Sequence, residues 1–196
     1  QRFGLVEQPV FDDEQIHRAM APYLPTFADG LVICPNGSGL VVAIDALFGE
    51  IAWAAHCGDF TRSGFRGSST TVAKTSHGFT GLPSPPTAHG NSVVYLPKVS
   101  AHLFCLDLAT GDRVWKVPRQ DALYVGSVTD NGVLVVGLNK LRLLSLLDGH
   151  EIWSKGIPIP SGRGIRSGET FMLPLKSGAV TVGDLATGKK ISQAEQ

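Results

Sequence analysis

The chain contains the stretch Cys105-Leu-Asp-Leu-Ala-Thr-Gly-Asp-Arg-Val-Trp115, whose pattern recurs three more times. An Asp precedes a turn Gly by four residues, and a Trp follows the same Gly by four residues. The other copies are Ala43–Trp53, Leu143–Trp153 (with Ser145 in place of the Asp) and Val182–Ser192 (with Ser192 in place of the Trp). Recurrence at fixed positions predicts a repeat architecture, in which we expect these residues to build the fold rather than to catalyse a reaction.

The spacing of the copies indicates the kind of repeat. The turn glycines are Gly49, Gly111, Gly149 and Gly188, with separations of 62, 38 and 39 residues. Two of these separations agree with a unit of about 40 residues, the size of a four-stranded propeller blade. The first separation has a surplus, which we assign to a Gly-, Ser- and Thr-rich insertion near residues 57–90 that holds at most one short strand.

Short β-branched and aromatic runs within each unit predict the strands. The third copy has four such runs, which are residues 123–127, 133–137, 141–146 and 151–154, and Asp130-Asn-Gly132 is typical of a hairpin turn. We therefore predict an all-β fold over residues 22–196, a partial β-propeller of about four four-stranded antiparallel blades. Residues 1–21 form a lead-in segment, in which the Asp-capped amphipathic pattern of Asp12–Met20 predicts a short helix.

Each recurring residue type has an expected role in the blade. Gly suits the positive φ needed after the turn between the third and fourth strands, and the Asp accepts hydrogen bonds from free backbone N–H groups of that turn. The Trp lies on the outermost strand, where we favour packing against the next sheet over stacking on a ligand ring. The predicted docking residues are Asp45, Gly49, Trp53, Asp107, Gly111, Trp115, Gly149, Trp153, Asp184 and Gly188.

The overall composition excludes several classes of function. The 17 Lys and Arg residues balance 17 Asp and Glu residues, so the charge pattern does not favour nucleic acid or an anionic membrane as a partner. No apolar run approaches the ~20 residues that cross a bilayer. The three cysteines have no repeated spacing, and we expect Cys34 and Cys105 to be buried, unpaired thiols rather than half of a disulfide.

Candidate chemical groups are few. The spacing of His56, Cys57, His77 and His89 matches no compact zinc pattern, so we predict no metal site, and no catalytic motif or cofactor-binding residue is recognisable. Two arginine pairs are candidates for binding an anion or a partner, against the alternative of solvated loop charge. They are Arg62 and Arg66 in the insertion, and Arg163 and Arg166 near an innermost strand of the fourth unit.

The pattern Ala-x-Asp-x-x-x-Gly-Glu-x-x-Trp at Ala43–Trp53, with Asp-x-x-Thr-Gly-x-x-x-Trp at Asp107–Trp115, resembles the tryptophan-docking repeat of PQQ-like (quinoprotein-type) β-propellers. One branch of that family consists of dehydrogenases that hold pyrroloquinoline quinone (PQQ) and Ca²⁺ beside two adjacent bonded cysteines, with an Asp as base. This chain has no Cys-Cys pair. The resemblance therefore favours the non-catalytic, BamB-like branch, whose propellers bind protein partners.

The resemblance implies a scaffold or protein-binding module in an extracytoplasmic compartment, without a cofactor. The alternative is a fragment of a PQQ-dependent oxidoreductase, which would use PQQ and calcium. Propellers close with about four to eight blades, usually six or more for repeats of this length, so we expect about half of a larger propeller. The expected partner is another protein or the remaining blades of the same propeller, because an open arc leaves two blade faces uncovered.

Overall fold

A computed structural model describes residues 23–36, 39–58, 84–98 and 100–194. These residues form four antiparallel sheets of four strands each, and every sheet is assembled in chain order. The predicted all-β class and the four four-stranded blades are therefore confirmed. The short helix expected at Asp12–Met20 lies outside the described residues.

The strands of the four blades have the following bounds. Blade 1 consists of β1 (Thr26–Ala28), β2 (Leu31–Pro35), β3 (Leu40–Asp45) and β4 (Ile51–His56). Blade 2 consists of β5 (Thr87–His89), β6 (Ser92–Tyr95), β7 (His102–Asp107) and β8 (Arg113–Pro118). Blade 3 consists of β9 (Ala122–Thr129), β10 (Gly132–Gly137), β11 (Lys140–Leu144) and β12 (Glu151–Gly156). Blade 4 consists of β13 (Ile165–Ser167), β14 (Thr170–Pro174), β15 (Val180–Asp184) and β16 (Lys190–Ala194).

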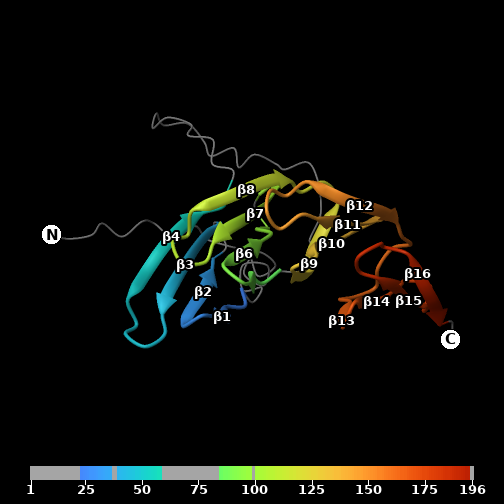
Figure 1. The fold of residues 1–196 in the computed structure, drawn as a ribbon, viewed down its shortest axis with the longest axis horizontal. Helices are drawn as coiled ribbons and strands as arrows, with labels where there is room; N and C mark the ends of the chain where they lie inside the picture. The colour runs from blue at the N-terminus through green and yellow to red at the C-terminus, as the bar shows by residue number, and fades with distance from the viewer. Residues whose placement is uncertain (1–22, 37–38, 59–83, 99, 195–196) are drawn as a thin grey trace, which may run out of the picture.

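The blades stand side by side along an arc (Figure 1). The first strands of the blades lie on the concave side and contact one another, as β1 meets β5, β5 meets β9, and β9 meets β13. The fourth strands β4, β8, β12 and β16 follow the convex rim (Figure 1). This radial arrangement is that of a β-propeller, with the concave surface facing its axis.

The structure extends some of the expected elements. The outer strand β12 continues to Gly156, beyond the predicted end at residue 154. Residues Thr87–His89, which we placed in the insertion, form β5, the innermost strand of blade 2. The described part of the insertion therefore supplies the first strand of blade 2.

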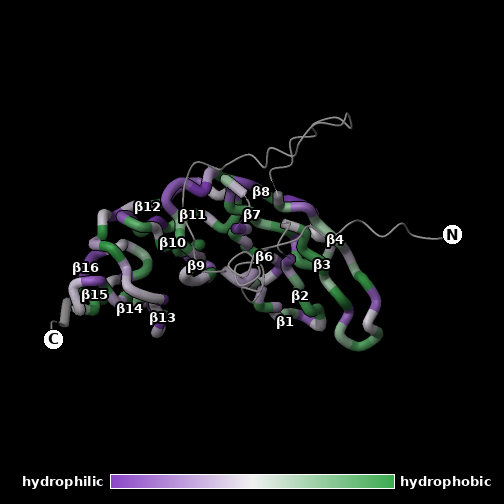
Figure 2. Tube along the Cα trace, turned by 180° about the vertical axis from the view of Figure 1, so that it is seen from behind, coloured by the Kyte–Doolittle hydropathy of each residue, from purple (hydrophilic) through white to green (hydrophobic). Residues whose placement is uncertain are grey.

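The hydrophobic core is divided into three layers, one between each pair of neighbouring blades. Figure 2 shows the hydrophobic residues concentrated along the middle strands and the hydrophilic residues more frequent on outer strands such as β12 and β16. The strand β10 is buried at every position, because Val133 and Val135 face blade 2 while Leu134 and Val136 face blade 4. In β14 of blade 4, by contrast, buried and partly exposed residues alternate, since only one face is covered by a described neighbour.

Candidate functional site

The turn between the third and fourth strands is built in the same way in blades 1 and 2. Asp45 Oδ1 accepts hydrogen bonds from the backbone N–H groups of Leu47 at 2.8 Å and Phe48 at 2.9 Å. In blade 2 the Asp107 Oδ1 atom accepts two bonds of 2.9 Å from the residues at the same positions. The turn glycine N–H then returns to the carbonyl of the Asp, and the glycine φ is +72° at Gly49 and +75° at Gly111.

The other two blades vary this turn. In blade 3 the Ser145 hydroxyl accepts a weaker bond of 3.3 Å from the Leu147 N–H. Hydrogen bonds from Ser145 and from His150 lower the pKa of the neighbouring Asp148 carboxyl to about 2. In blade 4 the Thr187 hydroxyl and N–H both donate to Asp184, and these bonds hold the pKa of that carboxyl below its usual value.

Each tryptophan crosses from its own blade to the turn of the next blade. The Trp53 indole N–H donates to the Leu108 carbonyl in blade 2 at 2.8 Å. The two later joints repeat this bond, from Trp115 to Leu146 at 2.8 Å and from Trp153 to Leu185 at 3.1 Å. The indoles of Trp53 and Trp115 are only 7% exposed, so the ring fills the gap between the two sheets.

The indole rests directly on the turn glycine of the next blade. A Cβ atom at Gly111 would lie 2.5 Å from Cε3 of Trp53, which is closer than any real contact. The same atom at Gly149 would lie 2.9 Å from Trp115, and at Gly188 it would lie 2.8 Å from Trp153. Glycine is therefore required at these positions for space as well as for its positive φ.

Sequence reasoning assigned the glycines to the turn alone and missed the carbonyl that accepts the indole N–H. That carbonyl always belongs to the residue after the Asp position, which is Leu108, Leu146 or Leu185. An apolar residue recurs at this position in the sequence. This recurrence was visible in the sequence. A backbone carbonyl is present in every residue type, however, so its role as an acceptor requires only that the residue be buried.

Two arginines between blades 2 and 3, the half-buried Arg119 and the buried Arg142, were also missed. The Arg119 guanidinium donates to the Pro97 carbonyl at 2.8 Å and to the Ala122 carbonyl at 3.1 Å. Arg142, which is 3% exposed, donates to the Arg119 carbonyl at 2.8 Å. Burial lowers the pKa of both guanidinium groups. Together they tie a loop of blade 2 to the strand that opens blade 3.

The predicted arginines of blade 4 lie near the axial surface. The Arg163 guanidinium carbon stands 5.1 Å from the centroid of the Tyr124 ring. The Tyr124 hydroxyl donates to the Gly162 carbonyl and accepts from the Gly164 N–H at 2.7 Å, so it fixes the connection between blades 3 and 4. The exposed Arg166 lies on β13 and donates to the Gly168 carbonyl at 3.3 Å. Arg62 and Arg66 lie outside the described residues.

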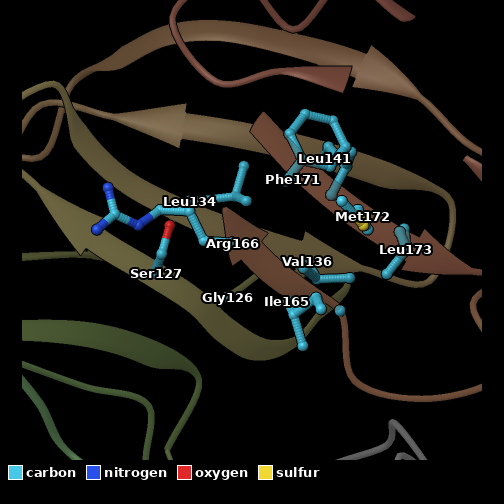
Figure 3. Close-up of a pocket in the computed structure, with 11 residues that line it drawn as sticks. Gly126, Ser127, Leu134, Val136, Leu141, Ile165, Arg166, Phe171, Met172 and Leu173 are labelled. Atoms are coloured by element: carbon cyan, nitrogen blue, oxygen red, sulfur yellow. The ribbon is translucent and has the colours of Figure 1, made fainter. Parts of the chain in front are cut away.

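A hollow lies beside Arg166, between the innermost strands of blades 3 and 4 (Figure 3). Its floor is apolar, with Leu134, Val136 and Phe171, and the Ser127 hydroxyl is buried there without a hydrogen-bond partner among the described residues. Its empty volume of about 260 Å³ includes the part open to solvent. Small-molecule sites occupy about 300–1,000 Å³. The hollow therefore suits a water molecule or a single side chain better than a cofactor.

Groups that could ligate a metal are dispersed in the part of the chain that the structure describes. No three His, Cys, Asp or Glu side chains gather there in a metal-binding group, and His77 lies outside it. His89 pairs instead with Asp130 of blade 3, with 2.8 Å between Nε2 and Oδ1.

All three cysteines are free thiols, and Cys105 is buried as predicted. The expectation that Cys34 is buried was wrong, because it pairs with Val42 on the face of blade 1 that no described blade covers, and it is only partly buried. Burial raises the pKa of Cys57 and Cys105 to about 11.

No described segment is a helix of the length and apolar character needed to cross a membrane.

The residues brought together by the fold form two kinds of feature. One is the set of docking joints on the outer part of the arc, and the other is the axial surface formed by the innermost strands.

Comparison with known families gives a match over most of the chain. The family described as outer membrane protein assembly factor BamB matches residues 37–196, which is most of the chain. None of the curated proteins matches this chain.

Solved structures share the fold at low sequence identity. BamB from Moraxella catarrhalis is 14% identical with a TM-score of 0.53, and the match covers 85% of this chain and 61% of that chain. Quinohemoprotein alcohol dehydrogenase from Comamonas testosteroni is 15% identical with a TM-score of 0.62, covering 87% of this chain and 34% of that chain. A europium-containing methanol dehydrogenase is 14% identical with a TM-score of 0.59, and the match covers 94% of this chain and 44% of that chain. This chain thus spans less than two thirds of each of these proteins.

Proposed function

Because this chain belongs to the family of the outer membrane protein assembly factor BamB, we propose that it is a non-catalytic β-propeller scaffold that binds protein partners. The observation that carries the proposal is the use made of its recurring residues. The Asp carboxylates bind turn N–H groups and the indoles bind carbonyls of the next blade, so the recurring groups support the blades themselves.

The axial surface is the face that we propose for partner binding. Polar contacts join the hairpin turns of neighbouring blades there, with His89 bonded to Asp130 and Asn131 bonded to Glu169 at 2.9 Å. These bonds hold blades 2, 3 and 4 in register, and stacked repeats present such a surface as an extended platform. Binding to a preformed platform requires little ordering of the protein.

Within this platform, the arginines are the proposed contacts to an acidic partner. Arg166 is exposed on the innermost strand of blade 4, and Arg163 is held over the Tyr124 ring beside it. A guanidinium group pairs well with carboxylates, because its planar fork can donate two hydrogen bonds at once. Arg62 and Arg66 of the insertion remain candidates for the same role.

The alternative function is that of a fragment of a PQQ-dependent oxidoreductase, with PQQ and calcium as cofactors. The likeness to the quinohemoprotein alcohol dehydrogenase fold favours it, although this chain covers 34% of that enzyme. The scaffold is preferred because the family match is to BamB. An extracytoplasmic location, in the periplasm or cell envelope, is proposed from the same family match.

A dye-reduction assay separates the two functions. The full chain is incubated with PQQ and Ca²⁺, an alcohol substrate is added, and reduction of an artificial electron acceptor is followed. A scaffold gives the same rate as PQQ and Ca²⁺ without protein. Steady turnover that depends on both the chain and PQQ would establish the oxidoreductase instead.

Photo-crosslinking in the source cells tests the axial platform. A photoreactive residue at position 166 should give discrete crosslinked products, whereas one at Lys155 on the exposed convex rim should not. Equal crosslinking from both positions would reject the axial surface as the binding face.

A further inference from the structure

The hollow between blades 3 and 4 is kept open by two glycines that line it. Gly126 is the extra residue of a β-bulge in β9, since it has no partner in the register with β10. A Cβ there would lie 3.2 Å from Val136 Cγ2, and a Cβ at Gly164 would lie 2.6 Å from the Met172 carbonyl oxygen. Bulges are frequent beside functional sites because they redirect a side chain. The side chain that follows this bulge is that of Ser127.

Two hydrogen-bond donors stand at one end of the hollow. The Ser127 hydroxyl oxygen is buried there and has no hydrogen-bond partner among the described residues. The exposed Arg166 lies at the same end (Figure 3), and its bond of 3.3 Å to the Gly168 carbonyl leaves further N–H groups for a ligand. The Glu169 carboxylate of the same hairpin is bonded instead to Asn131 of blade 3. A ligand group with two acceptor oxygens would therefore satisfy both donors.

The other end of the hollow is apolar (Figure 3). Val136, Phe171 and Leu173 line it and are at most 5% exposed. At the mouth, Ile165 is 65% exposed beside Arg166 on the innermost strand β13. The described residues around the hollow include no carboxylate, so the ammonium group of a free amino acid would have no partner there. The hollow thus suits an aliphatic group with a carboxylate close to it.

In a polypeptide, these two groups leave the same Cα atom only at an aliphatic C-terminal residue. Inside an extended segment, an acidic side chain and its aliphatic neighbour point to opposite faces, so a hollow for one side chain cannot receive both. The hydroxyl of Ser127 is buried, and a carboxylate reaches it only by entering the hollow together with the aliphatic group. The exposed Ile165 offers an apolar contact to the residue before the C-terminus, which a free short-chain acid lacks.

We propose that this hollow binds the C-terminal residue of a separate polypeptide, with an aliphatic side chain of the size of leucine. The α-carboxylate accepts hydrogen bonds from the Ser127 hydroxyl and the Arg166 guanidinium, and the side chain contacts Phe171 and Leu173. The preceding residues of the partner pass over Ile165. This inference rests on the proposed partner binding at the axial surface, and it names the chemistry that is recognised there.

A peptide titration on the full chain, followed by NMR of the backbone N–H groups, tests the proposal. The probe is acetyl-Gly-Ser-Gly-Val-Leu with a free carboxylate, and the same peptide with a C-terminal amide is the matched control. The free acid should shift the N–H signals of Gly126, Ser127 and Gly164 most strongly. The amide should bind at least about tenfold more weakly, because the charge-assisted bonds are lost. No binding of the free acid, equal binding of the two peptides, or shifts away from the hollow would overturn the proposal.

Two substitutions assign the contacts to the carboxylate. Arg166→Gln should weaken binding of the free acid by about tenfold and leave the weak binding of the amide unchanged. Lys176→Gln removes the same charge from an exposed turn of blade 4 and should change neither. Parent-like binding of the free acid by Arg166→Gln, or an equal loss in Lys176→Gln, would reject the role of this guanidinium.

Ser127→Ala separates binding from folding. The hydroxyl has no described partner to lose, so the urea midpoint should not fall, whereas binding of the free acid should weaken by about threefold or more. A lower midpoint with parent-like binding would show that the hydroxyl supports the fold and not the ligand.

A free short-chain acid is the other occupant tested. Isocaproate has the carboxylate and the branched aliphatic end of a terminal leucine, but it has no preceding residue to contact Ile165. It should bind at least about fivefold more weakly than the peptide, because it buries less apolar surface. Binding as tight as that of the peptide would overturn the assignment to a polypeptide.

The outcome is distinguishable from that of the proposed scaffold function. Crosslinking from position 166 reports any protein at the axial surface, so failure of the peptide titration alone would reject the C-terminal ligand and leave the axial surface as a binding face.

Discussion

Gly111 satisfies two separate requirements of its turn. Its φ of +75° favours a residue without a Cβ, and the Trp53 ring occupies the space where a Cβ would stand. The indole in turn fills the gap between the sheets and donates to a carbonyl that would otherwise be buried without a partner. Glycine and tryptophan therefore act as a pair that belongs to two different blades.

The first prediction concerns a single indole. Trp115→Ala removes the ring that packs between blades 2 and 3 and should lower the free energy of unfolding by about 3–5 kcal/mol, as large-to-small core changes do. Urea denaturation measures the change, and Val114→Ala at the half-exposed neighbouring position serves as the control. A loss below about 1 kcal/mol for Trp115→Ala would contradict the packing role.

The second prediction concerns the thiols. Burial raises the pKa of Cys57 and Cys105 to about 11, so at pH 8 only about one thiol in a thousand is a reactive thiolate. Cys34 is partly exposed and should be alkylated first by iodoacetamide in the native protein. Mass spectrometry after timed quenching gives the order, and all three should react at similar rates in urea. Native modification of Cys105 ahead of Cys34 would contradict the burial.

At the scale of elements, the turns are held by carboxylates whose charge matters. The pKa of Asp148 is lowered to about 2 by hydrogen bonds from Ser145 and His150, from an ordinary value of 3.8. When the pKa of a carboxyl is lower in the folded state than in the unfolded state, its charge stabilises the fold fully at a pH above the unfolded-state pKa. This stabilisation is lost as the pH falls through the folded-state pKa. The window for this turn is therefore from about pH 4 down to about pH 2.

The third prediction follows from the downward shift of the Asp148 pKa. The carboxyl of Asp148 should titrate near pH 2 in a carbon-detected NMR experiment, and Ser145→Ala should move its pKa upward toward 3.8 because the first of its hydrogen bonds is removed. Asp148→Asn should reduce the loss of stability of the whole chain between pH 4 and pH 2. An unchanged pKa in Ser145→Ala would show that the serine does not hold this carboxylate.

The fourth prediction concerns the arginines between blades 2 and 3. Arg119→Lys keeps the charge but loses the fork that reaches the Pro97 and Ala122 carbonyls together. We expect a loss of about 1–3 kcal/mol in the free energy of unfolding, because a buried acceptor is left without its donor. Lys116→Arg on the exposed side of β8 is the matched control. Equal stability of Arg119→Lys and the parent chain would argue against the clamp.

Sequence patterns predicted the elements better than the contacts between them. The Asp–Gly–Trp spacing and the apolar runs located all four blades, because strands and turns are determined by neighbouring residues. The three-residue strand β5 was placed in the insertion, since Thr87–His89 has no alternating pattern long enough to stand out. Arg142 was missed because its burial depends on a single carbonyl, that of Arg119, which lies in a loop 23 residues earlier.

At the scale of the whole molecule, the arc has different ends. Blades 2 and 3 are covered on both faces, whereas blades 1 and 4 each have a described neighbour on one face only. The sequence predicted an incomplete disc through the number of its repeats, and this stays a prediction. It did not show that the turn of blade 1 is open to an indole while blade 4 has Ser192 at the tryptophan position, because that difference appears only when the joints are seen side by side.

The joints also determine how the arc should unfold. Each pair of neighbouring blades shares one core layer and is linked by one indole. The stability of a blade therefore depends on the blade beside it. Breaking a single joint should therefore lower the stability of both blades that meet there.

The most direct test of tryptophan docking compares Gly111→Ala with Gly49→Ala in urea denaturation. Both substitutions introduce alanine at nearly the same positive φ, +75° and +72°, so the backbone strain is matched. Only Gly111 lies under an indole, with 2.5 Å between the new Cβ and Cε3 of Trp53. Docking predicts that Gly111→Ala lowers the free energy of unfolding by about 1–3 kcal/mol more than Gly49→Ala does. Equal losses, within about 0.5 kcal/mol, would contradict it.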